Sequence, residues 1–238
     1  MGFFDFITGG EEGQIKRHAK RIKNLNAQAE DRQMSAYWLA EQGSEEAVYG
    51  LLGRFSVTYE QRMKDADEKK MVYDLLLGIG EGACEPIRAW VRKNENFALP
   101  FQVLDELQGP AAAVDLLLDM LGREVDPFKT EKKRQILIKL ADYQDPRIVD
   151  RVPALLEDFD EGVRYAAAEA LISQETNEVL DDLAKALANP EEESNRLRVR
   201  ISTTFHQRSW SLGEHMSNIA GRPPVGWVVA NGKMQPDT

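Results

Sequence analysis

The chain has 238 residues, 42% of them hydrophobic and 29% charged, which is typical of a globular protein and not of a disordered one. Its formal net charge of -10 argues against a general nucleic-acid binder, because such a protein needs a concentrated basic surface. Cys84 is the only cysteine, which excludes an intrachain disulfide and a cysteine-based metal site. Helix formers are abundant and alternating β-branched runs are scarce, so we expect an all-α fold.

We do not expect the first residues to be a secretory signal. The apolar stretch near Met1 is short and lacks the preceding basic region of a secretory signal. No stretch reaches the roughly 18–20 apolar residues of a membrane span, so we expect a cytoplasmic protein. We expect Phe3, Phe4, Phe6 and Ile7 to cap the open core of the first helical pair. Docking of residues 3–23 on a partner or membrane surface is the alternative.

A basic amphipathic helix is predicted over residues 14–24, within an N-terminal cap of residues 1–27. Ile15, Ala19 and Ile22 lie on one helical face. The residues between them are rich in lysine and arginine and include no acid. A helix of this kind binds acidic partners, nucleic acid or anionic lipid, or forms a solvated face. We favour the solvated face.

Helical pairs follow, separated by turn and cap signals. Gly43-Ser44, Gly109-Pro110 and Asp145-Pro146 each mark a helix end followed by a helix start. Residues 56–67 are expected to be a polar connection. The predicted pairs are 28–42 with 45–55, 67–79 with 83–93, 98–107 with 110–122, 129–141 with 146–157, and a last pair within 158–187.

The first and last pairs repeat each other at a fixed distance. Arg32, Ala36, Leu39, Val48 and Leu51 each lie 132 positions before a residue of the same or similar type. An offset of 132 equals four periods of 33, which is within the range of helical-pair repeats. The matching residues are Arg164, Ala168, Leu171, Leu180 and Leu183.

The stretch 158–187 is the clearest copy of the unit. Its small apolar residues recur at three- and four-residue steps, and Thr176 and Asn177 are expected to cap its second helix. The stretch resembles a HEAT-like repeat of the kind found in the phycobilisome-lyase group of repeat proteins. The residues that carry the resemblance are Asp160, Val163, Arg164, Ala166, Ala167, Ala168, Ala170, Leu171, Val179 and Leu180.

The resemblance implies an all-α, right-handed α-solenoid of about five helical hairpins in a single domain, residues 1–238, with the repeats at 28–187. A terminal half-repeat and tail occupy 194–238. The helix at about 194–208 is again basic, and Asn231-Gly232 is the preferred turn of a two-residue β-hairpin. We expect the hairpin to cap the last helix, with Trp227 and Val229 pointing inward.

No catalytic or cofactor-binding motif is present in the sequence. His206 and His215 are too widely spaced for a metal pair on one helical face. The carboxylates are interpreted as solvated faces and helix starts. We expect Arg164 to be a structural brace that pairs with a turn aspartate such as Asp160. The expected protein is therefore non-enzymatic, with no cofactor and no metal.

The resemblance also implies a binding surface, because the second helix of each HEAT-like pair generally lines the concave side. The outward residues of these helices have mixed charge, which suits a protein or peptide partner better than nucleic acid. The candidate partner-binding residues are Glu46, Tyr49, Arg54, Glu85, Arg88, Arg92, Asp115, Asp119, Arg151, Asp182 and Lys185.

Two other functions stay open. Likeness to the phycobilisome lyases implies a chromophore-handling enzyme, although fold-level likeness alone supports it. Likeness to the HEAT-like alkylpurine DNA glycosylases implies a nucleic-acid enzyme, against which the net charge of -10 weighs. The basic segments 16–23 and 196–208 keep a nucleic-acid role in view. The leading hypothesis is a protein-interaction scaffold.

Overall fold

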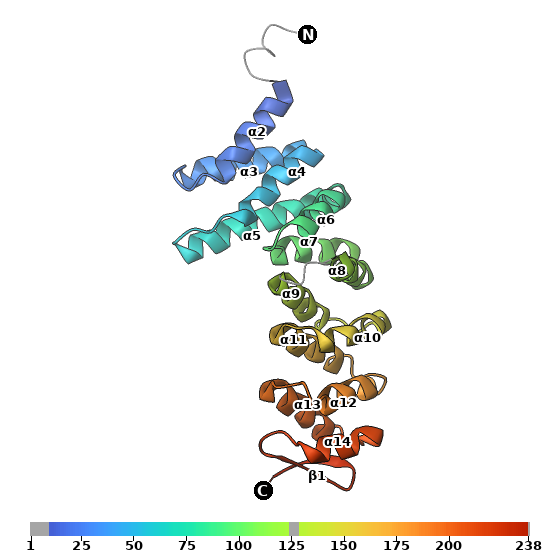
Figure 1. Cartoon of the computed structure of the whole chain (residues 1–238). Helices are drawn as coiled ribbons and strands as arrows, with labels where there is room; N and C mark the ends of the chain where they lie inside the picture. The colour runs from blue at the N-terminus through green and yellow to red at the C-terminus, as the bar shows by residue number, and fades with distance from the viewer. Residues whose placement is uncertain (1–9, 124–128, 238) are drawn as a thin grey trace. The chain divides into compact units, whose positions relative to one another are not determined.

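The structure is a computed structural model that describes residues 10–123 and 129–237. Contacts divide the chain into two units, residues 1–116 and 117–238. Each unit consists of helical pairs, and a small antiparallel sheet follows the helices of the second unit (Figure 1). The predicted all-α class and terminal hairpin are confirmed. The right-handed solenoid and the single domain stay predictions.

The first unit contains three successive helical pairs preceded by an extra helix. The first helices of neighbouring pairs pack against each other, and the second helices of the first two pairs do the same. Its elements are α2 (Gly10–Ile22), α3 (Ala29–Gln42), α4 (Glu45–Leu52), η1 (Gly53–Ser56), α5 (Arg62–Ile79), η2 (Gly80–Ala83), α6 (Cys84–Lys93), α7 (Ala98–Gln108) and α8 (Pro110–Arg123), which runs past the unit boundary.

The turn between α3 and α4 shows how local sequence sets the helix ends. Gly43 has φ 59°, a left-handed conformation that glycine adopts without steric cost. The Ser44 hydroxyl then accepts a hydrogen bond from the backbone N–H of Ala47 at 3.3 Å. The predicted end of one helix and start of the next are both confirmed.

Two predicted helix starts in this unit are wrong. The first helix starts at Gly10 and not at residue 14, so it includes Glu11 and Glu12, and Glu12 pairs with Lys16 at 2.5 Å. Acids in a first turn complement the helix dipole. The predicted connection 56–67 is also shorter, because α5 already begins at Arg62. The expected contacts of Phe3, Phe4, Phe6 and Ile7 lie outside the described residues.

The second unit repeats the arrangement. Within it α11 packs against α9 and η3, and α12 packs against η3, α13 and α14. Its elements are α9 (Thr130–Leu140), α10 (Pro146–Arg151), η3 (Pro153–Glu157), α11 (Glu161–Ile172), α12 (Leu180–Ala188), α13 (Asn195–Gln207), η4 (Gly213–His215), α14 (Met216–Gly221), β1 (Trp227–Ala230) and β2 (Lys233–Pro236).

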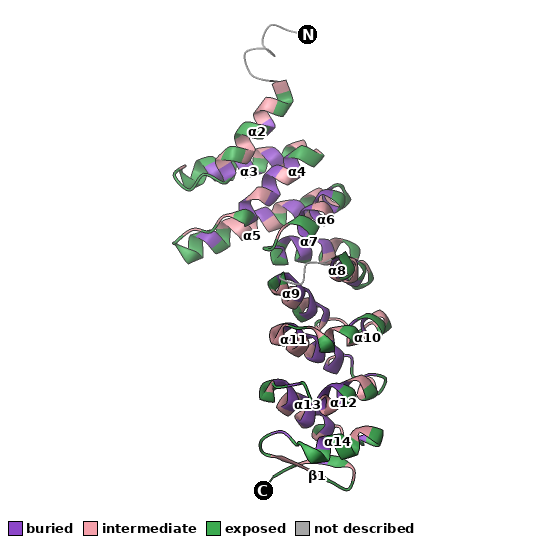
Figure 2. Cartoon of the chain, in the orientation of Figure 1, coloured by how far each residue is buried: buried purple, intermediate pink, exposed green. Residues whose placement is uncertain are grey.

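The alanines of α11 lie at helix contacts. Ala167, Ala168 and Ala170 have no exposed surface, and Ala166 is 5% exposed. A small side chain lets the axes of two packed helices approach closely. The prediction that these alanines form a buried face is confirmed, and Figure 2 shows buried residues along the contacts between helices of this unit.

Cap residues of the fifth pair differ from the prediction. Asp160 caps α11 by accepting a hydrogen bond from the Val163 N–H at 2.9 Å, and the carboxylate that Arg164 binds is that of Glu192. Thr176 and Asn177 do not cap α12, which begins at Leu180. Asn177 instead accepts a hydrogen bond from the indole N–H of a later residue, Trp210, at 2.8 Å.

The tail forms the predicted hairpin. β1 and β2 pair with Val229 opposite Met234, and Asn231 and Gly232 both have positive φ, as the two-residue turn requires. The sheet packs on α13, where His206 Nδ1 lies 3.1 Å from the Met234 carbonyl oxygen. Trp227 and Val229 are only half-buried, and Met234 is the fully buried residue of this face.

Among residues 10–123 and 129–237, no helix is both long enough and apolar enough to cross a bilayer.

Candidate functional site

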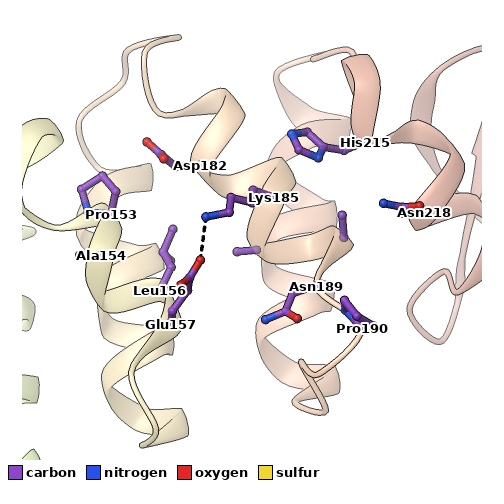
Figure 3. A pocket seen from close by; sticks show the side chains of 12 residues that line it. Pro153, Ala154, Leu156, Glu157, Asp182, Lys185, Asn189, Pro190, His215 and Asn218 are labelled. Carbon is purple, nitrogen blue, oxygen red and sulfur yellow. Dashed lines mark hydrogen bonds and ion pairs between the residues drawn. The ribbon is translucent and has the colours of Figure 1, made fainter.

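A groove in the second unit is lined by side chains from three segments that are separated in the sequence. The groove has a volume of about 550 Å³ and is lined by residues of η3, α12 and the η4–α14 segment. Figure 3 shows Glu157, Asp182, Lys185 and His215 around it. We call it the η3–α12 groove.

The break between α10 and η3 shapes one wall. Pro153 has no N–H to donate, so the α-helix that begins at Pro146 does not continue through it, and a 3₁₀ segment follows. The lining also includes buried apolar side chains: Leu156 is 4% exposed and Ala186 is 9% exposed. Apolar groups in a groove favour burial of a partner's apolar side chains.

Charged side chains of both signs form the rim. Glu157 Oε1 lies 2.8 Å from Lys185 Nζ, and both side chains are largely exposed. The hydrogen bond from Lys185 to Glu157 raises the pKa of that amine. Burial, and secondly the charge of Asp181, raises the pKa of the Asp182 carboxyl. The rim therefore offers a surface ion pair that a partner can rearrange at low cost, because exposed pairs stabilise a fold little.

An imidazole and two carboxylates meet at one end of the groove. His215 Nε2 lies 3.1 Å from Asp181 Oδ1, and ligand atoms of Asp181, Glu214 and His215 all lie within 4.8 Å of one another. These are donor types that bind divalent cations. Both carboxylates are exposed, which is common without a bound ion, so we assign no metal. Sequence reasoning missed this cluster because 34 residues separate Asp181 from His215.

Only two of the predicted binding residues, Asp182 and Lys185, lie in this groove. In the same unit, Arg151 is exposed on α10, and Asp119 on α8 pairs with Arg123 at 2.6 Å. The groove also contains Glu157, which the sequence did not single out.

The predicted residues of the first unit other than Arg54 lie on α4, α6 and α8. Arg88 lies 3.5 Å from Glu85 and also donates to the Gln108 side chain. Burial raises the pKa of the Tyr49 phenol, with smaller contributions from the charges of Glu45 and Glu85. Glu46, Arg92 and Asp115 are exposed on the same three helices.

Arg54 is not a surface residue, which corrects its assignment to the binding face. Its side chain has no exposed surface and donates to Asp65 at 2.7 Å, to Glu68 at 3.1 Å and to the Val57 carbonyl at 3.0 Å. The ring of Tyr59 lies 4.1 Å from the guanidinium carbon. The helix ends before Arg54 and a 3₁₀ turn directs this side chain inward, so helical spacing assigned it to the wrong face.

Comparison with known families matches residues 114–202 to the model described as HEAT repeats. This segment runs from α8 to α13 and contains two of the three walls of the groove. No curated protein shows significant sequence similarity to the chain. HEAT repeats are commonly scaffolds for protein interaction and are typically non-catalytic.

Proposed function

We propose that this protein, whose residues 114–202 match HEAT repeats, is a non-enzymatic scaffold that binds a protein or peptide partner. In the second unit the partner lies in the η3–α12 groove. The surface of α4, α6 and α8 provides a further contact. We place this scaffold in the cytoplasm.

The observation that carries the proposal is the composition of the groove. Its lining combines apolar residues such as Leu156 with the Glu157–Lys185 pair and Asp182. Protein interfaces combine an apolar centre with a polar rim, and rim charges set specificity and association rate. A surface with both signs of charge suits a polypeptide that itself carries both, whereas nucleic acid needs a continuous positive surface.

A photo-crosslinking experiment tests the location. A photoreactive phenylalanine analogue replaces Lys185 in the groove, and in a matched variant it replaces Ile138, which is 58% exposed on α9. We expect a discrete crosslinked polypeptide from the Lys185 position and none from the Ile138 position. Equal crosslinking from both positions means that the groove is not the binding surface.

Charge exchange then tests the role of the rim on the partner so identified. Lys185→Glu places two like charges at the pair and should reduce the association rate at low salt. The exchange variant Glu157→Lys, Lys185→Glu restores the internal pair with inverted polarity. If binding depends only on an intact ion pair between positions 157 and 185, the exchange restores binding. If the partner contacts the individual charges, as we propose, the exchange variant still binds weakly.

A further inference from the structure

A smaller cavity adjoins the η3–α12 groove. Its volume is about 240 Å³, and it shares Ala188, Asn189, Pro190 and Asn218 with the groove. Two arginines, Arg198 and Arg222, complete its charged lining, and its lining includes no acid. We call it the Arg198 pocket.

Arg198 is a buried cation without a carboxylate partner among the described residues. The residue is 6% exposed, its Nη2 donates to the backbone carbonyl of Arg222, and its Nε has no acceptor. Glu192 is the acid that acts on it most directly, but both Glu192 oxygens already accept hydrogen bonds from Arg164. Burial, and secondly the charge of Arg222, lowers the pKa of Arg198.

A second positive charge lies at the same pocket. The Arg222 side chain is exposed, and its Nη1 donates to the Pro190 carbonyl oxygen at 2.6 Å. Two guanidinium groups with no acid between them repel each other, and a buried charge without a counterion is unfavourable. An anion in the pocket offsets both effects.

The other arginines of this unit show which anion fits. Arg164, Arg196 and Arg200 each hold a glutamate side-on, with Nε on one carboxylate oxygen and Nη2 on the other. This geometry matches a planar carboxylate in two parallel hydrogen bonds. In Arg198, Nη2 donates to a backbone carbonyl and Nε has no acceptor. The edge of its guanidinium that could bind a carboxylate is therefore only half occupied.

We propose that the Arg198 pocket binds the carboxylate of an aspartate or glutamate side chain from the polypeptide that occupies the η3–α12 groove. The carboxylate takes the place of the Arg222 carbonyl at Nη2, adds the contact at Nε, and is neutralised from the other side by the Arg222 guanidinium. This inference rests on the proposed function, since the groove brings the acidic side chain to the pocket.

The test follows the arginine Nε–H signals of the ¹⁵N-labelled full chain by NMR. The probes are N-acetyl-glutamate N-methylamide, its glutamine counterpart and inorganic phosphate. We expect the Arg198 signal to move on addition of the glutamate compound and to stay in place with the glutamine compound. No movement with the glutamate compound, or a stronger response to phosphate, overturns the proposal.

Two variants assign the response to the pocket. Arg222→Gln keeps the fold, because its side chain is exposed, and should weaken binding of the glutamate probe by about tenfold. Arg196→Gln is the matched control: it removes an exposed arginine of the same helix, whose side chain pairs with Glu161, and should leave binding unchanged. Equal weakening by both variants points to net charge alone and overturns the assignment.

The two proposals fail separately. Crosslinking from position 185 without any response of Arg198 overturns only the carboxylate pocket. A response of Arg198 to the probe without crosslinking in the groove overturns the scaffold function and leaves an isolated carboxylate site.

Discussion

The guanidinium of Arg164 holds the carboxylate of Glu192 through two hydrogen bonds, 2.7 Å from Nε and 3.0 Å from Nη2. Its Nη1 donates to the carbonyls of Asp158 and Phe159. In the first unit Arg32 binds Glu68 through the same two nitrogens, and its Nη1 donates to the Ala27 carbonyl. Arg32 and Arg164, which match at the 132-residue offset, therefore make equivalent contacts in their two units.

Loss of this brace should destabilise the second unit. The Glu192 side chain is 3% exposed and that of Arg164 is 17% exposed, so Glu192→Gln removes the carboxylate that neutralises a half-buried guanidinium. We expect the free energy of unfolding to fall by about 3 kcal/mol. Urea titration followed by circular dichroism measures it. The control is Glu193→Gln, an exposed neighbour, which should change stability by less than about 0.5 kcal/mol. Similar losses in both variants contradict the assignment.

Arg54 should be the most sensitive arginine of the first unit. Its side chain is fully buried between Asp65 and Glu68, and Arg54→Met removes the cation that both carboxylates face. We expect a loss of about 3–5 kcal/mol in the free energy of unfolding. Arg62→Met, at an exposed position eight residues further along the chain, is the control and should be nearly neutral. A stable Arg54→Met protein contradicts the buried assignment.

The same carboxylates should make the first unit sensitive to acid. Burial by itself raises the pKa of Asp65 and of Glu68. Hydrogen bonds outweigh this effect: Asp65 accepts them from Lys69 and Arg54, and Glu68 accepts them chiefly from Arg32. Both pKa values are therefore lowered. A carboxyl whose pKa is lowered in the folded state stabilises the fold fully when the pH is above its unfolded-state pKa, which is near 3.8 for Asp65 and 4.5 for Glu68. This stabilisation is lost as the pH falls through the folded-state pKa.

We therefore expect the free energy of unfolding to decrease as the pH falls below about 4.5. The measurement is a series of urea titrations between neutral and acidic pH. In the doubly substituted protein Asp65→Asn, Glu68→Gln this part of the pH dependence should be absent. Parallel curves for the two proteins mean that other groups cause the acid sensitivity.

Gly50 should be required for the contact between α2 and α4. A Cβ at this position would lie 3.1 Å from the Ala19 Cβ and 3.2 Å from the Leu39 Cδ1, closer than ordinary contact. Gly50→Ala should destabilise the unit by about 1–3 kcal/mol, because the packed helices must separate. Thermal or urea unfolding measures the change.

Gly78 provides the opposite case in the same unit. It lies in α5, and a Cβ there would meet no atom within 4 Å. Gly78→Ala should therefore stabilise the protein by about 0.5–1 kcal/mol, because alanine has the higher helix propensity. If both substitutions change stability in the same direction, the close approach at Gly50 is not what restricts that position.

Several features of the fold followed from the sequence because they depend on short-range interactions. The hydroxyl of Ser44 caps its own helix, Asp145 caps the helix that starts at Pro146, and Asn231-Gly232 makes the hairpin turn. Periodicity also identified the buried alanines of α11, since a helical face is set by residues three and four apart.

The candidate site depended on pairs far apart in sequence. Arg164 pairs with Glu192 and not with Asp160, and Asp181 meets His215 across 34 residues. Local spacing placed Arg54 on the surface, whereas the 3₁₀ turn buries it.

The sequence shows how many arginines the chain has, but it does not show which arginine lacks a counterion. That depends on which carboxylates lie near each guanidinium in the folded chain. The sequence by itself determined the helical pairs and the turns at Gly43-Ser44, Asp145-Pro146 and Asn231-Gly232. Only the tertiary structure decided that Arg164 is neutralised by Glu192 and that Arg198 is buried beside a cavity with its Nε unpaired.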